Sequence, residues 1–239
     1  MTTTTLPNKA LAVHRCLREV FGERPQRSHL DPIAELVSTI ISQNTNDGLR
    51  DQAFDTLRQR FSTWEEVRDS PVEKVTAAIR IAGLSQQKAP RIQAALRHIT
   101  TERGELSLDF LRAMGVEGAR EWLTAMDGVG PKTAAIILLF ALGMPAFPVD
   151  THIHRVTKRL GLIPTDASRE KAHVLLEALL PPETYLSFHL NVIQHGREVC
   201  QARRPRCELC KLRDLCDYYH AAVRPQTTAG TPSAAGEPT

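Results

Sequence analysis

Apolar residues recur at helical spacing along most of the chain. The clearest case follows Asp31-Pro32, an N-cap residue and a proline at the first helical position. The apolar positions after this pair keep the i, i+3, i+4 spacing of one helix face: Ile33, Leu36, Val37, Ile40 and Ile41. We find no segment with the period-two alternation of a half-buried strand. The pattern therefore predicts an all-α protein.

Further segments are predicted to be helical. One begins at Ser70-Pro71-Val72-Glu73, where Ser70 and Glu73 have the spacing of a capping box, and Gly83 is expected to end it. The others cover residues 88–99, 119–126, 132–142, 151–160, 168–180 and 183–196. The two ends of the chain, residues 1–7 and 221–239, are expected to be disordered.

The composition agrees with a packed globular protein. The 239 residues are 42% hydrophobic and 24% charged, whereas only 5% are aromatic. No apolar run reaches the roughly 18 residues of a membrane span. Residues 1–8 lack the apolar stretch of a secretory signal, so a cytoplasmic protein is expected. The net charge of +3 says little about nucleic acid, because the position of the charges matters more than their sum.

A five-residue turn, Asp127 to Pro131, joins two of the predicted helices. Gly128 and Gly130 permit positive φ and leave backbone N–H groups uncovered at the start of the second helix. The helix dipole favours an anion there, such as a DNA phosphate. Lys132 and Thr133 add a cation and a hydroxyl beside it. The alternative is an ordinary helix–loop–helix with two glycines; a P-loop fits poorly, because its glycine spacing and its strand are missing.

Four of the five cysteines lie close together. Cys200, Cys207, Cys210 and Cys216 have the spacing C-x6-C-x2-C-x5-C, whereas Cys16 stands alone. Thiolates at such spacing hold Zn²⁺ or an iron–sulfur cluster. Zinc sites usually pair two C-x2-C knuckles, and this segment has only one, so the spacing favours an iron–sulfur cluster over zinc or unliganded thiols.

The cysteine-rich segment is also basic. Between residues 197 and 213, two residues are negative and six are positive: Arg197, Arg203, Arg204, Arg206, Lys211 and Arg213. A metal-stapled loop lined with arginine can contact a phosphate backbone. Alternatively, these charges only offset the negative thiolates and keep the surface hydrated.

Two ionisable residues stand near the glycine turn. Asp150 precedes a predicted helix, where an N-cap role is the ordinary interpretation. Lys132, taken alone, is an ordinary surface cation. Their common context changes this interpretation, because three motifs in this order resemble endonuclease III of the helix-hairpin-helix base-excision superfamily. The motifs are residues 126–134 (MDGVGPKTA), residues 149–153 (VDTHI) and the four-cysteine loop, and the likeness runs from about residue 30 to residue 219.

The resemblance implies a two-domain helical fold. Residues 30–145 would form a six-helix domain that contains the helix-hairpin-helix motif, at about residues 119–142. Residues 8–29 together with 146–220 would form a second domain, in which the four cysteines hold a [4Fe-4S] cluster. The groove between the domains would hold DNA.

The resemblance also implies an activity, that of a DNA glycosylase and AP lyase. Lys132 would be the nucleophile and Asp150 its carboxylate partner. The expected partner is double-stranded DNA with a damaged base, such as an oxidised pyrimidine, or an abasic site, bound by a monomer. Motifs and resemblance together place these residues on DNA: Asn44, Leu84, Gly128, Val129, Gly130, Thr133, Arg203, Arg204 and Arg206.

The chain departs from the family pattern at a few positions. The hairpin usually starts Leu-Pro-Gly, but here it reads Met126-Asp127-Gly128, and Pro131 stands where a basic residue is common. Asn44 stands where the family often has glutamine. Two alternatives stay open: a monofunctional adenine or thymine glycosylase, which generally lacks the lysine, and a non-catalytic DNA-binding module.

Overall fold

The computed structural model describes residues 5–24 and 31–223, and these residues form helices and loops without a strand. The expected all-α fold is therefore confirmed. The α-helices are α1 (Leu6–Phe21), α2 (Pro32–Ser42), α3 (Asp47–Arg60), α4 (Trp64–Asp69), α5 (Val72–Ala78), α6 (Ser85–Arg103), α7 (Gly115–Thr124), α8 (Pro131–Ile136), α9 (Thr151–Leu160), α10 (Arg169–Leu179) and α11 (Tyr185–Glu198). Short 3-10 turns connect them: η1 (Arg80–Ala82), η2 (Asp109–Met114), η4 (Pro182–Thr184), η5 (Cys207–Leu209) and η6 (Arg213–Leu215). There are also two π-helical turns among the described residues. The turn η3 (Ile137–Ala141) continues α8, and η7 (Tyr219–Val223) ends the described chain. Among the described helices, none is long and apolar enough to cross a bilayer.

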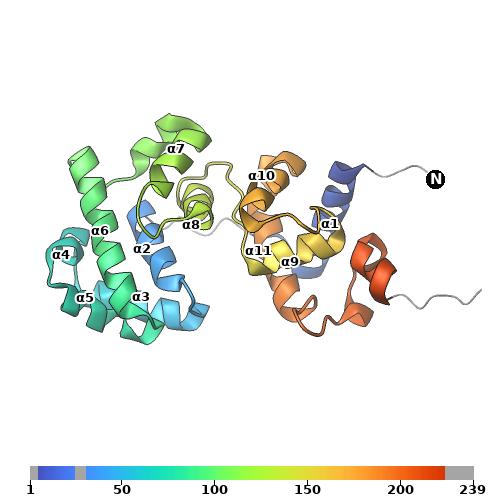
Figure 1. Ribbon diagram of the computed structural model, residues 1–239, viewed down its shortest axis with the longest axis horizontal. Coiled ribbons are helices and arrows are strands. Elements are labelled where there is room, and N and C mark those ends of the chain that lie inside the picture. Colours follow the sequence, from blue (N-terminus) through green and yellow to red (C-terminus); the bar gives the residue numbers. More distant parts are fainter. Residues whose placement is uncertain (1–4, 25–30, 224–239) are drawn as a thin grey trace, which may run out of the picture.

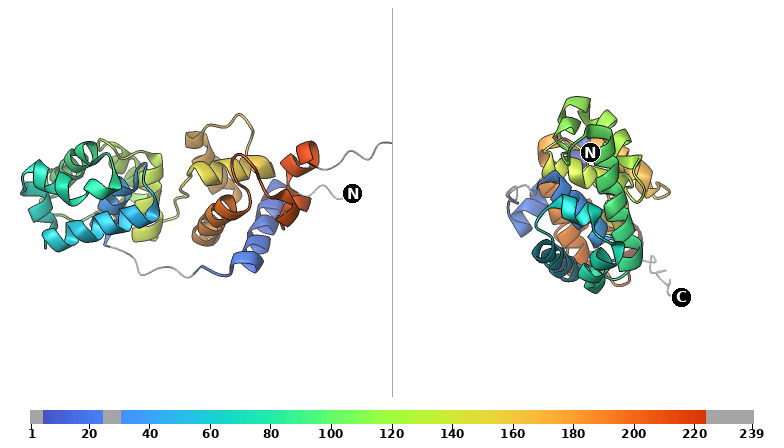
Figure 2. Two further views of the ribbon diagram at one scale, coloured as in Figure 1. Left: turned by 90° about the horizontal axis from the view of Figure 1, so that it is seen from below. Right: turned by 90° about the vertical axis from the view of Figure 1, so that its left-hand side faces the viewer.

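The helices form two lobes (Figure 1). Each lobe has its own hydrophobic core. The first lobe consists of α2 to α8, and the second of α1, α9, α10, α11 and the cysteine loop. Figure 2 shows the lobes side by side, with the chain crossing from η3 to α9 between them. Side chains interleave at this crossing, because Leu139 packs in the second core and Ala146 in the first. The residue-by-residue domain division expected from the sequence stays a prediction.

Side-chain caps define where several helices begin. The Asp31 carboxylate accepts a hydrogen bond from the Ala34 N–H at 3.1 Å, so the predicted cap of α2 is confirmed. The capping box predicted at Ser70 is wrong. Ser70 ends α4, because its N–H donates to the Glu66 carbonyl at 3.1 Å, and α5 starts after Pro71 without a side-chain cap. The capping box lies one helix earlier, between Thr63 and Glu66. Gly83, at a φ of 67°, ends η1 rather than α5.

The apolar pattern missed three helices: α1, α3 and α4. In α3 only Ala53 and Leu57 are buried, so its apolar face is too narrow to produce a helical repeat. Helix α1 starts at Leu6, so the last two residues of the segment expected to be disordered, 6 and 7, are helical. Likewise, residues 221–223 complete η7. The rest of these terminal segments, except Thr5, lies outside the described residues.

Candidate active site

Lys132 and Asp150 come from opposite lobes. Lys132 is exposed in the first turn of α8, on the first lobe. Asp150 is half-buried at the start of α9, on the second lobe, and its Oδ1 accepts a hydrogen bond from the Ile153 N–H at 2.7 Å. The ordinary N-cap role of Asp150 is therefore confirmed. The cap fixes the carboxylate at the edge of its lobe.

A buried histidine connects these two charges. His189 of α11 is 4% exposed, and its Nδ1 donates a hydrogen bond to the Pro148 carbonyl at 3.0 Å. Burial lowers the pKa of His189 to about 4; the Asp150 carboxylate opposes this shift, and the Lys132 ammonium adds to it. Both charges therefore lie within electrostatic reach of one imidazole, although they belong to different lobes. Sequence reasoning missed His189, because a histidine on an apolar helix carries no motif.

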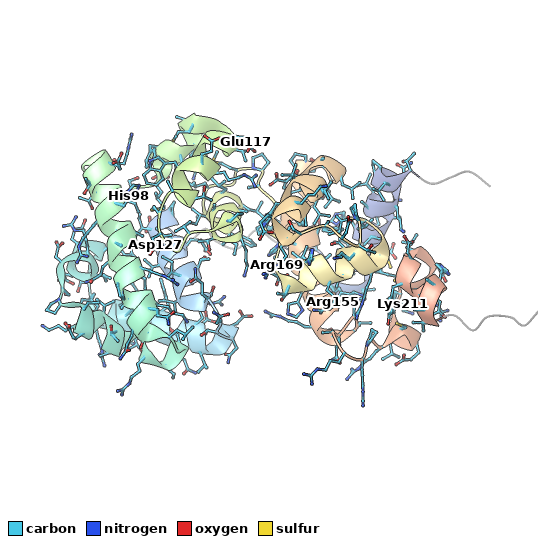
Figure 3. The ribbon with its side chains drawn as sticks, in the orientation of Figure 1. His98, Glu117, Asp127, Arg155, Arg169 and Lys211 are labelled. Atoms are coloured by element: carbon cyan, nitrogen blue, oxygen red, sulfur yellow. The ribbon has the colours of Figure 1, made fainter. Side chains whose placement is uncertain are left out.

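The backbone that leads to Asp150 is held from the second lobe. The Phe147 N–H donates to Glu177 Oε1 at 2.7 Å, and His173 Nδ1 donates to the Phe147 carbonyl at 2.7 Å. Glu177 also accepts two hydrogen bonds from Arg120 of α7, at 2.8 and 3.0 Å, which joins the two lobes. A carboxylate and two histidines thus position Phe147 and Pro148 just before Asp150. Figure 3 marks the hairpin residue Asp127 on one lobe and Arg155 of α9 on the other.

The hairpin turn needs glycine at one of its two glycine positions. Gly128 has a φ of 79°, and a Cβ there would lie 2.8 Å from Arg91 Cδ. Gly130 has a φ of −89°, so the expected use of positive φ is wrong for this residue. It is exposed at the N-cap of α8, and a Cβ there would meet nothing within 4 Å.

Two other hairpin residues are turned away from the surface. The Val129 side chain is buried, and its N–H donates to the Met126 carbonyl at 3.1 Å. Thr133 is 6% exposed. The hydroxyl expected beside a phosphate at Thr133 is therefore inside the lobe, and the Val129 amide already has a partner. The anion site that the turn can offer is formed by Gly128, Gly130 and Lys132.

Asn44 and Leu84 share an uncommon backbone conformation. Their φ angles are 55° and 50°, and among the described residues they are the only non-glycine residues with positive φ. Both are exposed, and 48% of Leu84 is accessible to solvent. Strained backbone of this kind concentrates at functional sites. The loop of Asn44 is also tied to the hairpin, because Gln43 Nε2 donates to the Gly128 carbonyl at 2.9 Å.

The four clustered cysteines line one hollow between α9, α11 and the C-terminal loop, together with Arg159 and His195. The hollow encloses about 380 Å³ outside the atoms, part of it open to solvent. Burial raises the pKa of the Cys210 thiol to about 11 and also raises that of Cys207 and Cys216. Within the described residues, no three His, Cys, Asp or Glu side chains are arranged around one metal ion. The number and type of donors around one hollow nevertheless fit an iron–sulfur cluster.

The cysteines of this hollow and Cys16 have different hydrogen-bond partners. Arg159 Nη1 donates to Cys200 Sγ at 3.3 Å, which suits a thiolate ligand. Cys16 faces another neighbour, because its Sγ donates to the Lys211 carbonyl at 3.6 Å. The basic residues Arg203, Arg204 and Arg206 are exposed on the same loop.

The two-lobed helical fold and the glycine hairpin at the edge of one lobe are the features to compare with known proteins. Residues 37–182 match the model of the HhH-GPD superfamily base excision DNA repair proteins. The match covers more than half of the chain, so the protein belongs to this superfamily of DNA glycosylases. Within it, the chain is similar to endonuclease III.

Individual relatives support this placement. Endonuclease III of Sulfolobus acidocaldarius is 33% identical, over 78% of this chain and 82% of its own, and that of Thermotoga maritima is 32% identical, over 87% and 93%. A protein of Arabidopsis thaliana that is provisionally named a DNA glycosylase is 38% identical, over 86% and 71%. A non-covalent endonuclease III–DNA complex superimposes with a TM-score of 0.77 at 28% identity, over 91% of this chain and 97% of that one.

Proposed function

We propose that the protein is a bifunctional DNA glycosylase and AP lyase that acts as a monomer on double-stranded DNA. Its substrates would be a damaged base, most simply an oxidised pyrimidine, and the abasic site left after excision. The observation that carries this proposal is that the charges of Lys132 on one lobe and Asp150 on the other both act on one buried histidine, His189. A monofunctional glycosylase has no need of a lysine there.

The first step would remove the damaged base from the stack. A base inside the duplex is out of reach, and its extrusion costs a few kcal/mol. Leu84 and Asn44 are exposed and held in fixed backbone conformations, so they can fill the vacated space and offset part of this cost. The backbone N–H groups of Gly128, Gly130 and Lys132 would bind the phosphate beside the extruded nucleotide, which leaves the Lys132 amine for the chemical step.

The second step would be chemical. The neutral Lys132 amine attacks C1′ of the sugar as the bond from C1′ to the base breaks, and the departing base takes up a proton. Loss of a further proton and opening of the sugar ring give a Schiff base between Nζ and C1′. The Schiff base acidifies the neighbouring C2′ proton, whose removal expels the 3′ phosphate by β-elimination. Asp150 would support the cationic transition state or transfer a proton.

The cysteine loop would contribute structure to this reaction. Cys200, Cys207, Cys210 and Cys216 would hold a [4Fe-4S] cluster, which supplies a rigid staple when bound. Cluster ligands are thiolates, and burial raises the pKa of Cys207, Cys210 and Cys216, so cluster binding would release protons. Arg203, Arg204 and Arg206 on the stapled loop would contact phosphates.

Borohydride trapping tests the central claim. The wild-type protein should be trapped covalently on a duplex that contains thymine glycol or an abasic site, because borohydride reduces a Schiff base to a stable amine. Lys132→Gln should lose trapping and nicking but still bind an abasic-site analogue, since the glycine amides and the groove remain. Lys74→Gln, an exposed lysine on α5, is the matched control and should behave as wild type.

The outcomes separate the candidate functions. Trapping by Lys132→Gln at the wild-type rate would place the nucleophile elsewhere. Base removal without trapping by the wild type would favour a monofunctional glycosylase. Binding without any base removal or nicking, across oxidised, mismatched and abasic duplexes, would indicate a non-catalytic module.

A further inference from the structure

Lys88 is a lysine in the interior of the first lobe. It lies on α6 and is 1% exposed, so its ammonium has almost no contact with water. Burial lowers its pKa. Lysines are almost never buried unless their charge is compensated, so the partners of this ammonium indicate what it does.

All three partners of Lys88 belong to segments that flank Asn44 and Leu84. Its Nζ donates to the Ile41 carbonyl at 2.8 Å and to Thr45 Oγ1 at 3.2 Å, on either side of the Asn44 loop. The third hydrogen bond, at 2.9 Å, goes to the carbonyl of Ala82, two residues before Leu84. An ammonium has three donors, so Lys88 is fully satisfied by these contacts.

The two loops are also bonded to each other at this point. Thr45 Oγ1 donates to the Ala82 carbonyl, which therefore accepts from both Thr45 and Lys88. Next to this junction stand Asn44 and Leu84, the two described non-glycine residues with positive φ. Strained conformations persist only where the surroundings fix them. The Lys88 ammonium at this junction contacts both loops and carries a formal charge.

We propose that Lys88 is a positioning residue that fixes the Asn44 loop and the Leu84 loop relative to each other, so that both side chains enter the duplex together. This inference rests on the proposed function, in which these two side chains replace an extruded base. Base extrusion leaves a gap beside the damaged base and an orphan base opposite it. Two probes at a fixed separation fill this space without first having to order two independent loops.

Another buried residue on the same helix provides a matched control. Gln93 is 2% exposed, and its Nε2 donates to the Val67 and Ser70 carbonyls at 2.9 and 2.6 Å. It therefore ties backbone segments together in the same lobe, but away from the two probing loops. Lys88→Met and Gln93→Met each replace a buried polar side chain by an apolar one of similar length and leave backbone carbonyls unpaired.

The first measurement is hydrogen–deuterium exchange on the protein without DNA. Lys88→Met should speed exchange in residues 42–47 and in residues 80–84 together, whereas Gln93→Met should leave both loops at the wild-type rate. This measurement does not depend on any activity. Unchanged exchange in either loop of Lys88→Met would overturn the proposed coupling. A failure of the proposed function would instead appear as a wild-type protein that neither excises nor traps.

The second measurement compares two substrates under single turnover. On a duplex with thymine glycol opposite adenine, Lys88→Met should excise the base about 10- to 100-fold more slowly, the effect expected from losing hydrogen bonds to a charged group. On a duplex with a preformed abasic site, no base must be extruded, and borohydride trapping should fall by less than about threefold. Equal losses on both substrates, or an equal excision defect in Gln93→Met, would show that Lys88 is only a stabilising residue. Lys88→Arg keeps the charge and should recover part of the excision rate.

Discussion

At the scale of single residues, the backbone conformation of Leu84 lowers the stability of the fold and presents a side chain that the proposed activity needs. Its φ of 50° and ψ of 27° place it in the left-handed region, which costs an L-residue roughly 1–2 kcal/mol. Almost half of its side chain is exposed, so packing compensates only part of this cost. In the proposed function this exposed side chain enters the duplex, which would offset the cost of the conformation.

The pair Leu84→Gly and Leu84→Ala separates backbone strain from the side chain. Both variants remove the wedge and should excise a damaged base more slowly than wild type by similar factors. The glycine variant should nevertheless be more stable than the alanine variant by about 1 kcal/mol, because glycine adopts positive φ without strain. Urea unfolding gives the stability difference, and single-turnover excision gives the rates. An alanine variant as stable as the glycine variant would contradict the strain, and wild-type excision by either would contradict the wedge.

Sequence reasoning identified residues that belong to motifs and missed residues that act through contacts. Lys132 and Asp150 were named because each stands in a short pattern, and the structure brings their charges to one imidazole. Thr133 was assigned to the surface from the same pattern, yet α8 turns it into the core. Lys88 and His189 have no local pattern at all. Lys88 bonds Ile41, 47 residues away, and His189 bonds Pro148, 41 residues away, so only the packing of helices reveals these contacts.

At the scale of elements, α11 supplies His189, a buried neutral histidine that bonds the backbone two residues before Asp150. The pKa of His189 is about 4 in the folded protein and about 6.5 in an unfolded chain, so only the unfolded state binds a proton between these values. Stability from this group is therefore present above pH 6.5 and is lost as the pH falls toward 4. At pH 5 the loss is about 2 kcal/mol.

The variant His189→Asn tests this dependence on pH. Asparagine retains an N–H that can donate to the Pro148 carbonyl but does not titrate. The variant should be less stable than wild type at pH 7, and the gap should narrow by about 2 kcal/mol at pH 5, because only the wild type loses the contribution of the histidine. Urea midpoints at the two pH values measure the gap. His220→Asn, at an exposed position, should leave the pH dependence unchanged; a constant gap for His189→Asn would mean that this histidine is not held neutral.

Helices were predictable from sequence where one face is strongly apolar. Helix α2 buries seven of its residues and was predicted from its apolar repeat and its cap. Helix α3 buries only two and was missed. Thr63 and Ser70 both stand three residues before a glutamate, and Ser70 fails as a cap because it still completes α4. Local spacing cannot decide between two such candidates, since the decision depends on where the preceding helix ends.

The cysteine loop makes a prediction about composition. Protein purified without oxygen should be brown and contain about four irons per chain. Cys16→Ser should retain all of the iron, because Cys16 lies outside the hollow, whereas Cys210→Ser should lose it. Iron and zinc analysis with visible absorption gives the answer. Colourless protein with about one zinc per chain would indicate a zinc-stapled loop, and loss of iron in Cys16→Ser would show a different ligand set.

At the scale of the whole molecule, buried contacts hold the two lobes together. Arg120 of α7 and Glu177 of α10 bond across the lobes with 14% and 18% of their side chains exposed. A second pair, Arg197 and Asp47, also spans the lobes at 2.9 Å, but more than half of each side chain is exposed. Exposed pairs contribute little to stability. Arg197 can therefore exchange Asp47 for a DNA phosphate at small cost, whereas Arg120 fixes the lobes.

The exposed arginines of the cysteine loop make a prediction about how DNA binding depends on salt. Neutralising Arg203, Arg204 and Arg206 to glutamine should weaken binding to damaged and undamaged duplexes alike, because phosphate contacts carry no sequence information. Each phosphate contact that the protein forms releases counterions from the DNA. Each contact that is lost should therefore lower the magnitude of the slope of log K against log salt by up to about 0.9. Binding titrations over a range of salt concentrations measure this slope.

A matched control separates the effect of these three arginines on binding from the effect of the protein's net charge. Neutralising three exposed cations elsewhere, Arg60, Lys74 and Lys171, changes the net charge equally but should leave the slope near its wild-type value. An unchanged slope in the loop variant would show that its arginines only balance the thiolate cluster. Equal losses in both variants would show that net charge, not position, governs binding. In the proposed enzyme a cluster fixes this loop, so loss of iron should lower the slope in the same way as loss of the three arginines.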